Sequence, residues 1–131
     1  MSRKEQREHI FRLVFGLEFN EVSEMPEQIK LYFEQLPAVP EEDQSFIRDK
    51  ACNIGAKREE IDRLLNEKTT GWKTSRMNKV DLTILRLAIY EINWDEEVPC
   101  KVAINEAIEL AKKYSGEGGP AFVNGVLAKF A

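Results

Sequence analysis

Few side chains in this sequence could carry out catalysis. His9 is the only histidine, so the chain offers one imidazole for acid–base chemistry and cannot build a metal site from several. Glu106 and Glu109 stand one helical turn apart, but carboxylates on an amphipathic helix usually face solvent or a partner. The sequence has no Glu-x-x-His pair, phosphate-binding loop or nucleophile elbow. These features favour a binding protein over an enzyme and predict no metal and no cofactor.

The two cysteines, Cys52 and Cys100, are isolated in the sequence. They lack Cys-x-x-Cys spacing, which is typical of incidental thiols in a reducing compartment rather than of a redox pair. No stretch approaches the roughly 20 apolar residues that cross a bilayer, and no apolar run follows the basic N-terminus. We therefore expect a cytoplasmic protein without a membrane segment.

Basic residues gather in two segments, although the net charge of the chain is −4. Near the N-terminus, Arg3, Lys4 and Arg7 recur at steps of about one helical turn, which would aim positive charge at a phosphate backbone. Residues 68–80 contain four basic side chains and no acidic one, with Trp72 among them as a ring on which a base can stack. Such charge runs are more often simply solvated, so alone they leave RNA binding as one alternative.

Apolar residues recur at helical spacing along most of the chain, and no segment shows the sustained alternation of a half-buried strand. We predict an all-α fold in one domain, because 131 residues suffice for one core. The stretch from Val80 to Ile92 is apolar nearly all round, which predicts a helix at the buried centre. The predicted helices span residues 2–19, 26–36, 40–67, 78–92, 99–114 and 122–130. The third is either one long helix or two nearly collinear ones, with Gly55 as the weak point.

Three segments are more specific than an amphipathic pattern. Residues 98–112 read Val-Pro-Cys-Lys-Val-Ala-Ile-Asn-Glu-Ala-Ile-Glu-Leu-Ala-Lys, residues 80–91 read Val-Asp-Leu-Thr-Ile-Leu-Arg-Leu-Ala-Ile-Tyr-Glu, and residues 122–127 read Phe-Val-Asn-Gly-Val-Leu. Together they resemble the NusB family of bacterial transcription antitermination factors. The resemblance covers nearly the whole chain and implies two packed helical bundles within a single RNA-binding domain, residues 1–131.

The resemblance also implies a function without catalysis. Members of the family bind the boxA sequence of nascent ribosomal RNA leader transcripts as a heterodimer with NusE, a small-subunit ribosomal protein, and help RNA polymerase read through terminators. We therefore expect boxA RNA, NusE and the RNA polymerase antitermination complex as partners.

Residues that match family positions become candidate RNA contacts. An arginine-rich N-terminal segment faces the RNA in the family, and in this chain the corresponding cluster is interrupted by Glu5 and Gln6. The Phe-Val-Asn-Gly motif lies close to where family members contact RNA. For Lys101 an RNA contact and an interhelical hydrogen bond both stay open. The candidate RNA-binding residues are Arg3, Lys4, Arg7, Lys101, Phe122 and Asn124.

Two further positions match the NusE-binding surface of the family. Relatives use an acidic residue at the start of the Ile-Leu-Arg-Leu-Ala-Ile-Tyr-Glu helix and an aromatic residue in the first helix, which correspond here to Asp81 and Phe15. The family's usual Gln-Ala-Leu-Tyr reads Arg-Leu-Val-Phe in residues 12–15, so the tyrosine hydroxyl is missing.

Two alternatives remain on the sequence alone. A domain similar to NusB precedes the catalytic domain of ribosomal RNA cytosine methyltransferases, so the chain could be a stand-alone targeting module. A homodimer that buries the RNA surface is the other alternative, supported by an exposed stripe of Phe11 and Phe15.

Overall fold

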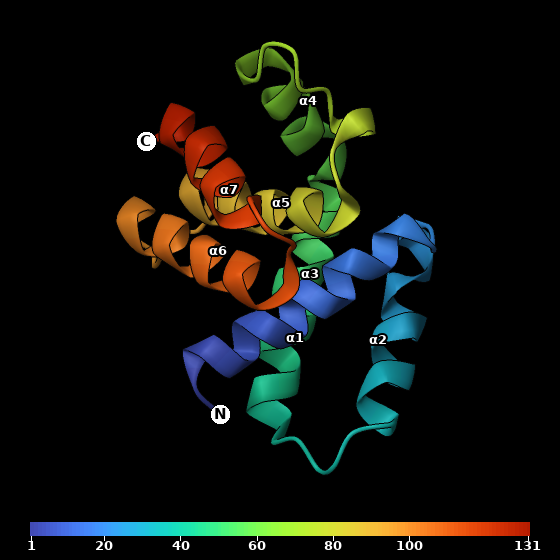
Figure 1. Ribbon diagram of the computed structural model, residues 1–131. Coiled ribbons are helices and arrows are strands. Elements are labelled where there is room, and N and C mark those ends of the chain that lie inside the picture. The colour runs from blue at the N-terminus through green and yellow to red at the C-terminus, as the bar shows by residue number, and fades with distance from the viewer. The chain divides into compact units, whose positions relative to one another are not determined.

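The computed structural model describes residues 1–131, and all its regular elements are helices (Figure 1). It divides into two compact units, residues 1–56 and residues 57–131. No helix is long and apolar enough to span a bilayer. The all-α prediction is confirmed, whereas a single domain of residues 1–131 stays a prediction.

The first unit contains α1 (Arg3–Phe15), α2 (Met25–Glu34) and α3 (Glu41–Ala56), and the second contains α4 (Arg58–Lys68), α5 (Lys79–Trp94), α6 (Cys100–Tyr114) and α7 (Gly119–Leu127). Short 3-10 helices span Gly16–Glu18, Val22–Glu24, Thr74–Arg76 and Ala128–Phe130.

In the first unit, α1 begins with a reciprocal cap. The Glu5 backbone N–H donates to Ser2 Oγ at 3.1 Å, and the Ser2 N–H donates to Glu5 Oε1 at 3.3 Å. The helix ends at Phe15, earlier than predicted, because the chain tightens into the 3-10 turn Gly16–Glu18. Helix α3 packs against both α1 and α2. The core of the unit is aliphatic and includes Ile10, Val14, Ile29, Ile47 and Ile54.

The segment predicted as one long helix or two forms two helices, α3 and α4, separated at Lys57. Gly55 is not the weak point, since α3 continues through it to Ala56. A Cβ atom at Gly55 would lie 2.5 Å from Met25 Sδ. The glycine therefore allows close packing of α3 against Met25 instead of breaking the helix.

In the second unit, α5 is the buried centre, as predicted. Asn78 caps the helix through its Oδ1, which accepts hydrogen bonds from the N–H groups of Val80 at 2.8 Å and Asp81 at 3.3 Å. All residues from Asp81 to Ile89 are buried, and α5 packs against α4, α6 and α7. A helix surrounded in this way needs apolar residues on every face.

Arg86 and Asp62 join α5 to α4 through a paired hydrogen bond. Arg86 Nε donates to Asp62 Oδ1 at 2.9 Å, and Arg86 Nη2 donates to Asp62 Oδ2 at 2.8 Å. The two side chains are 7% and 23% exposed. Such a bidentate pair compensates a buried guanidinium that would otherwise be costly in the core.

The loop between α6 and α7 is anchored to α5 by Asp81. Ser115 Oγ donates to Asp81 Oδ1 at 2.5 Å, and Gly118 takes a left-handed conformation with φ +87°. Gly119 follows as the first residue of α7, where an added Cβ would lie 2.5 Å from Ser115 Cβ and 3.4 Å from Asp81 Oδ1. The turn therefore requires glycine at both positions.

Removing Asp62 should destabilise the protein strongly. Asp62→Ala leaves the Arg86 guanidinium buried without this carboxylate, so we expect a loss of about 3 kcal/mol in the free energy of unfolding. The matched control Glu60→Ala breaks an exposed pair with Lys57, 3.6 Å apart, and should cost at most ~0.5 kcal/mol. Urea unfolding of the three proteins measures this; equal losses in the two variants would contradict the role of the buried pair.

Two glycines of α7 should respond in opposite directions to alanine. Gly119→Ala forces a methyl group onto Ser115 and should cost about 1–3 kcal/mol of stability. At Gly125 nothing lies within 4 Å of the added Cβ, so Gly125→Ala should be neutral or stabilise by up to ~1 kcal/mol. Thermal unfolding of both variants provides the comparison. A Gly119→Ala protein as stable as the wild type would show that Ser115 does not hold the turn as described.

Candidate nucleic-acid interface

The basic N-terminus of α1 exposes two of its three candidate RNA contacts. Arg3 and Lys4 are exposed, whereas Arg7 is only 8% exposed. The Arg3 guanidinium lies 5.7 Å from the centroid of the Phe46 ring, which is within cation–π range and holds the side chain at this end of the unit. The first turn of α1 therefore presents two cations to solvent, and an RNA contact by Arg7 stays a prediction.

Asp43 of α3 holds the start of the chain in place. Its Oδ1 accepts a hydrogen bond from Gln6 Nε2 at 2.8 Å, and its Oδ2 lies 3.7 Å from the N-terminal amino group of Met1. Because the carboxylate is 9% exposed and faces these two groups, the chain terminus is tied to α3 and not free. The tie orients the first turn on which Arg3 and Lys4 stand.

In the second unit, Phe122 packs against Trp72. Their ring centroids are 5.3 Å apart and their planes meet at 65°, an edge-to-face arrangement. Trp72 is 53% exposed, and Phe122 is half-buried. The sequence singles out both rings separately, but nothing in their spacing predicts that they touch. Lys101, in the first turn of α6, and Asn124, on α7, are both exposed.

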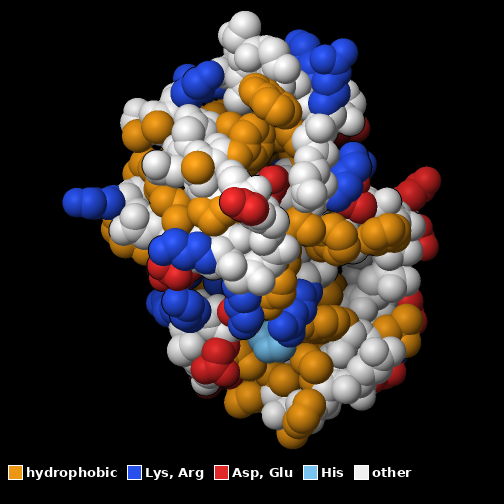
Figure 2. Space-filling view, viewed as in Figure 1, with side chains coloured by type: hydrophobic (Ala, Val, Ile, Leu, Met, Phe, Trp, Pro, Cys, Tyr) orange, Lys and Arg blue, Asp and Glu red, His pale blue; other side chains and the backbone are white.

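Two hollows adjoin this aromatic pair. The first, of about 410 Å³, contains Arg76 but also the carboxylates of Asp81 and Glu117, beside the loop of residues 115–119. The second, of about 280 Å³, is lined by Thr69, Trp72, Ala121, Phe122, Gly125, Val126 and Lys129. Figure 2 shows apolar side chains gathered over the region of α4 and α7, with lysine or arginine side chains at the edges.

The candidate partner residues differ in their exposure. Phe15 is half-buried at the end of α1, with its ring 6.4 Å from that of Phe11 and 5.5 Å from that of Phe19. Phe11 is 4% exposed, so it belongs to the core, while Phe19 is 75% exposed. The exposed stripe is therefore Phe15 and Phe19, and the i, i+4 spacing of these two rings in the sequence was the available signal.

Asp81 is 8% exposed, and one of its carboxylate oxygens accepts the hydrogen bond from Ser115. It also borders the first hollow beside the aromatic pair. A contact between Asp81 and a partner stays a prediction. The Asp81 carboxylate would then bind the partner and Ser115 of the α6–α7 loop at the same time.

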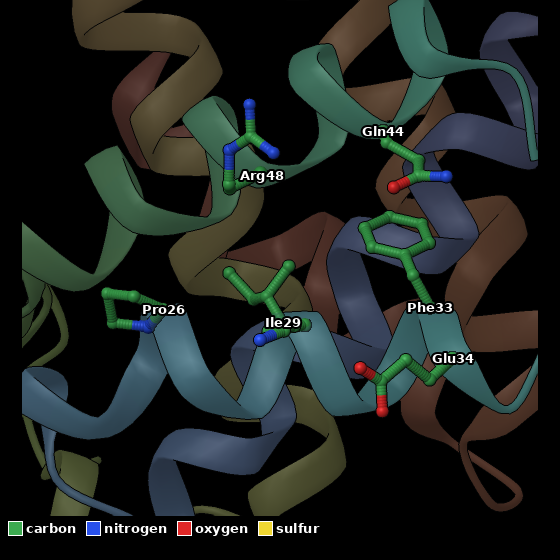
Figure 3. A pocket seen from close by; sticks show the side chains of 7 residues that line it. Pro26, Ile29, Phe33, Glu34, Gln44 and Arg48 are labelled. Carbon is green, nitrogen blue, oxygen red and sulfur yellow. The ribbon is translucent and has the colours of Figure 1, made fainter.

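A third hollow, of about 390 Å³, lies between α2 and α3 and contains no residue that the sequence singled out. Figure 3 shows Ile29 and Phe33 projecting from α2 toward the helix that carries Gln44 and Arg48. Its charges are mixed, with Lys30 and Arg48 against Glu34. A lining that carries both charges does not favour an anionic ligand over a cationic one.

Two groups that could take part in acid–base or nucleophilic chemistry, His9 and Cys52, have pKa values shifted by their surroundings. Burial raises the pKa of the Cys52 thiol, with a smaller contribution from Asp49, so the thiolate is disfavoured. Burial, followed by Arg12, lowers the pKa of His9, whose Nδ1 lies 2.6 Å from the Tyr32 hydroxyl. Because the folded-state pKa of His9 is below its ordinary value, this group stabilises the fold above about pH 6.5, and that contribution is lost as the pH falls.

Comparison with known proteins covers the whole chain. The family model described as the NusB family matches residues 4–131. The chain is 52% identical over 129 residues to the transcription antitermination protein NusB of Lachnoclostridium phytofermentans, with 98% of each chain covered. It is 50% identical over 131 residues to the protein of that name from Agathobacter rectalis, with 100% of each covered.

Solved structures agree with the sequence matches. The structure of T. maritima NusB superposes with a TM-score of 0.85 at 30% identity, covering 100% of this chain and 91% of that one. A chain from a structure titled as a plectonemic RNA supercoil superposes with a TM-score of 0.84 at 24% identity, which concerns the fold alone. With a family model that spans residues 4–131 and relatives of 50% identity or more over their full lengths, the chain belongs to the NusB family of transcription antitermination proteins.

Proposed function

We propose that this protein binds the boxA sequence of ribosomal RNA leader transcripts together with NusE, and that the complex helps RNA polymerase read through terminators. The observation that carries the proposal is the match to transcription antitermination proteins over the full length of the chain. This role requires no catalysis and implies a cytoplasmic protein.

Exposed cations and aromatic rings support the RNA-binding part of the proposal. Arg3 and Lys4 offer charge for phosphates on the first unit, and Lys101 offers it on the second. Phe122 and Asn124 provide an aromatic ring and an amide for unpaired bases. Since the net charge of the chain is −4, these local groups and not the protein as a whole must attract the RNA.

The aromatic surface at the end of α1 supports the part of the proposal that concerns NusE. Phe19 exposes most of a large apolar side chain next to Phe15, so the two rings are available to a protein partner. Aromatic anchors of this kind dominate protein–protein interfaces. Asp81 is the second proposed contact, on the other unit. A second copy of this chain is the competing occupant of the Phe15 and Phe19 surface.

Loss of the exposed N-terminal cations should weaken RNA binding in a salt-dependent manner. For Arg3→Ala/Lys4→Ala we expect lower affinity for single-stranded boxA RNA and a salt slope shallower by about 1.4, since each lost phosphate contact removes about 0.7. Lys30→Ala, an exposed lysine on α2, is the matched control and should leave the slope unchanged. Fluorescence anisotropy at four salt concentrations, with a scrambled RNA beside boxA, measures both. An unaltered slope in the double variant removes the first turn of α1 from the interface.

Truncating the exposed ring at the end of α1 should affect the protein partner and spare the RNA. Phe19→Ala should weaken NusE binding about tenfold, close to 1.4 kcal/mol, and leave the affinity for boxA in the absence of NusE unchanged. Leu31→Ala, which removes a 41% exposed apolar side chain from α2, should change neither. Calorimetric titration with NusE provides the measurement, and sedimentation at several concentrations reports self-association. If Phe19→Ala dissolves a dimer and leaves NusE binding intact, the surface serves the homodimer.

A further inference from the structure

We infer that the hollow between Trp72, Phe122 and Lys129 holds one unpaired base of the bound RNA, stacked on the exposed indole, with its phosphate near the Lys129 ammonium. The inference rests on the proposed RNA-binding function. It adds two residues, Trp72 and Lys129, to the candidate RNA contacts. Trp72 lies in the basic segment 68–80, whereas Lys129 lies outside every segment that the sequence singled out.

The geometry of the aromatic pair leaves a ring face available. Trp72 and Phe122 meet edge to face, at 65° and 5.3 Å between centroids. In such a pair only one ring turns a face toward its partner, so broad π surface remains uncovered. The 53% exposure of Trp72 is in accord with an indole that is anchored on one side and open on the other. A preoriented, partly exposed ring is what a stacking base requires.

The backbone around Trp72 is held in place, which makes the ring a fixed platform. Thr69 Oγ1 donates to the carbonyl oxygen of Leu65 at 2.5 Å and lies 2.6 Å from the carbonyl oxygen of Trp72. The Trp72 N–H donates to the Thr69 carbonyl oxygen at 3.2 Å. Thr69 is only 2% exposed, so this turn is part of the folded core. The indole consequently loses little freedom on binding a base.

Charge distinguishes the two hollows beside the pair. The hollow on the Arg76 side also contains the carboxylates of Asp81 and Glu117, whereas the hollow on the other side contains one charged residue, Lys129. A nucleotide joins an apolar, flat base to an anionic phosphate, so it favours the hollow without carboxylates. The acid-free run from Lys68 to Val80 adds positive potential to the same region.

The size and lining of the hollow also suit a single base. Its volume of about 280 Å³ is close to the ~300 Å³ lower limit of ligand pockets. Ala121 and Gly125 contribute minimal side chains, and nothing lies within 4 Å of a Cβ built on Gly125. Val126 supplies a buried apolar floor. A larger residue at Gly125 would therefore occupy the space proposed for the base.

Trp72 fluorescence tests the inference directly. In a Trp94→Phe background, Trp72 is the only tryptophan, because the chain has two. We expect boxA RNA to quench its emission with the same midpoint that anisotropy of labelled RNA gives. An RNA with abasic sites in place of its bases should bind more weakly without quenching, because the phosphates remain but nothing stacks.

Variants of the hollow provide the second measurement. Trp72→Leu should weaken boxA binding about tenfold to hundredfold, the usual effect of losing one stacked base. Gly125→Leu, which keeps Trp72 but fills the hollow, should weaken it similarly, and Lys129→Ala should lower the salt slope by about 0.7. Lys112→Ala, an exposed lysine on α6, is the control for Lys129. Circular dichroism and thermal unfolding verify that each variant is folded.

The outcomes separate the inference from the proposed function. Specific boxA binding without Trp72 quenching, and with normal affinity in Trp72→Leu, overturns the inference and leaves the proposed function intact. Quenching by NusE and not by RNA assigns the hollow to the protein partner and also overturns it. No preference for boxA over a scrambled RNA, with or without NusE, overturns both. Quenching by boxA together with weakened binding of Trp72→Leu and Gly125→Leu supports the stacked base.

Discussion

Burial of α5 is the constraint on which the second unit depends. A helix with nine consecutive buried residues, Asp81–Ile89, can tolerate polar side chains only if each has a partner, because an unpaired buried polar group costs about 1–3 kcal/mol. The structure meets this requirement: no buried side-chain nitrogen or oxygen lacks a hydrogen-bond partner. Arg86 pairs with Asp62 of α4, and Asp81 accepts from Ser115 before α7. The first contact attaches α5 to α4, the helix before Trp72, and the second attaches it to the loop before α7, the helix that carries Phe122. The packing around α5 therefore also positions these two rings.

Recognition in this protein has to be local. A net charge of −4 gives no general attraction to RNA, so the proposed binding relies on short basic segments from which acids are absent or in which they are already paired. Asp43 illustrates the pairing, since it faces the chain terminus and Gln6 instead of the exposed cations of α1. Stacking of bases on aromatic rings would add a contribution to the binding free energy that salt does not screen. The proposed RNA contacts therefore include a salt-sensitive contribution from α1 on the first unit and, separately, a stacking contribution from Trp72 and Phe122 on the second.

Features that depend on neighbours in sequence could be predicted, and those that depend on packing could not. The cap at Asn78 and the buried α5 follow from local residue types, and both are present. Gly55 was misjudged because helix propensity says nothing of Met25, which approaches it from another helix. The burial of Arg7 and the contact between Trp72 and Phe122 arise from tertiary packing, so residue spacing did not reveal them. The family's role came from specific residue runs, which no amphipathic pattern could supply.

Amide chemical-shift mapping during titration with boxA RNA tests whether the basic and the aromatic segments both contact the RNA. We expect the perturbed amides to cluster in the first turn of α1, in residues 69–76 and in residues 119–129, and we expect added NusE to shift a further set at residues 15–19. Perturbations confined to the hollow between α2 and α3, or no perturbation at a large excess of boxA RNA, would contradict the proposed interface.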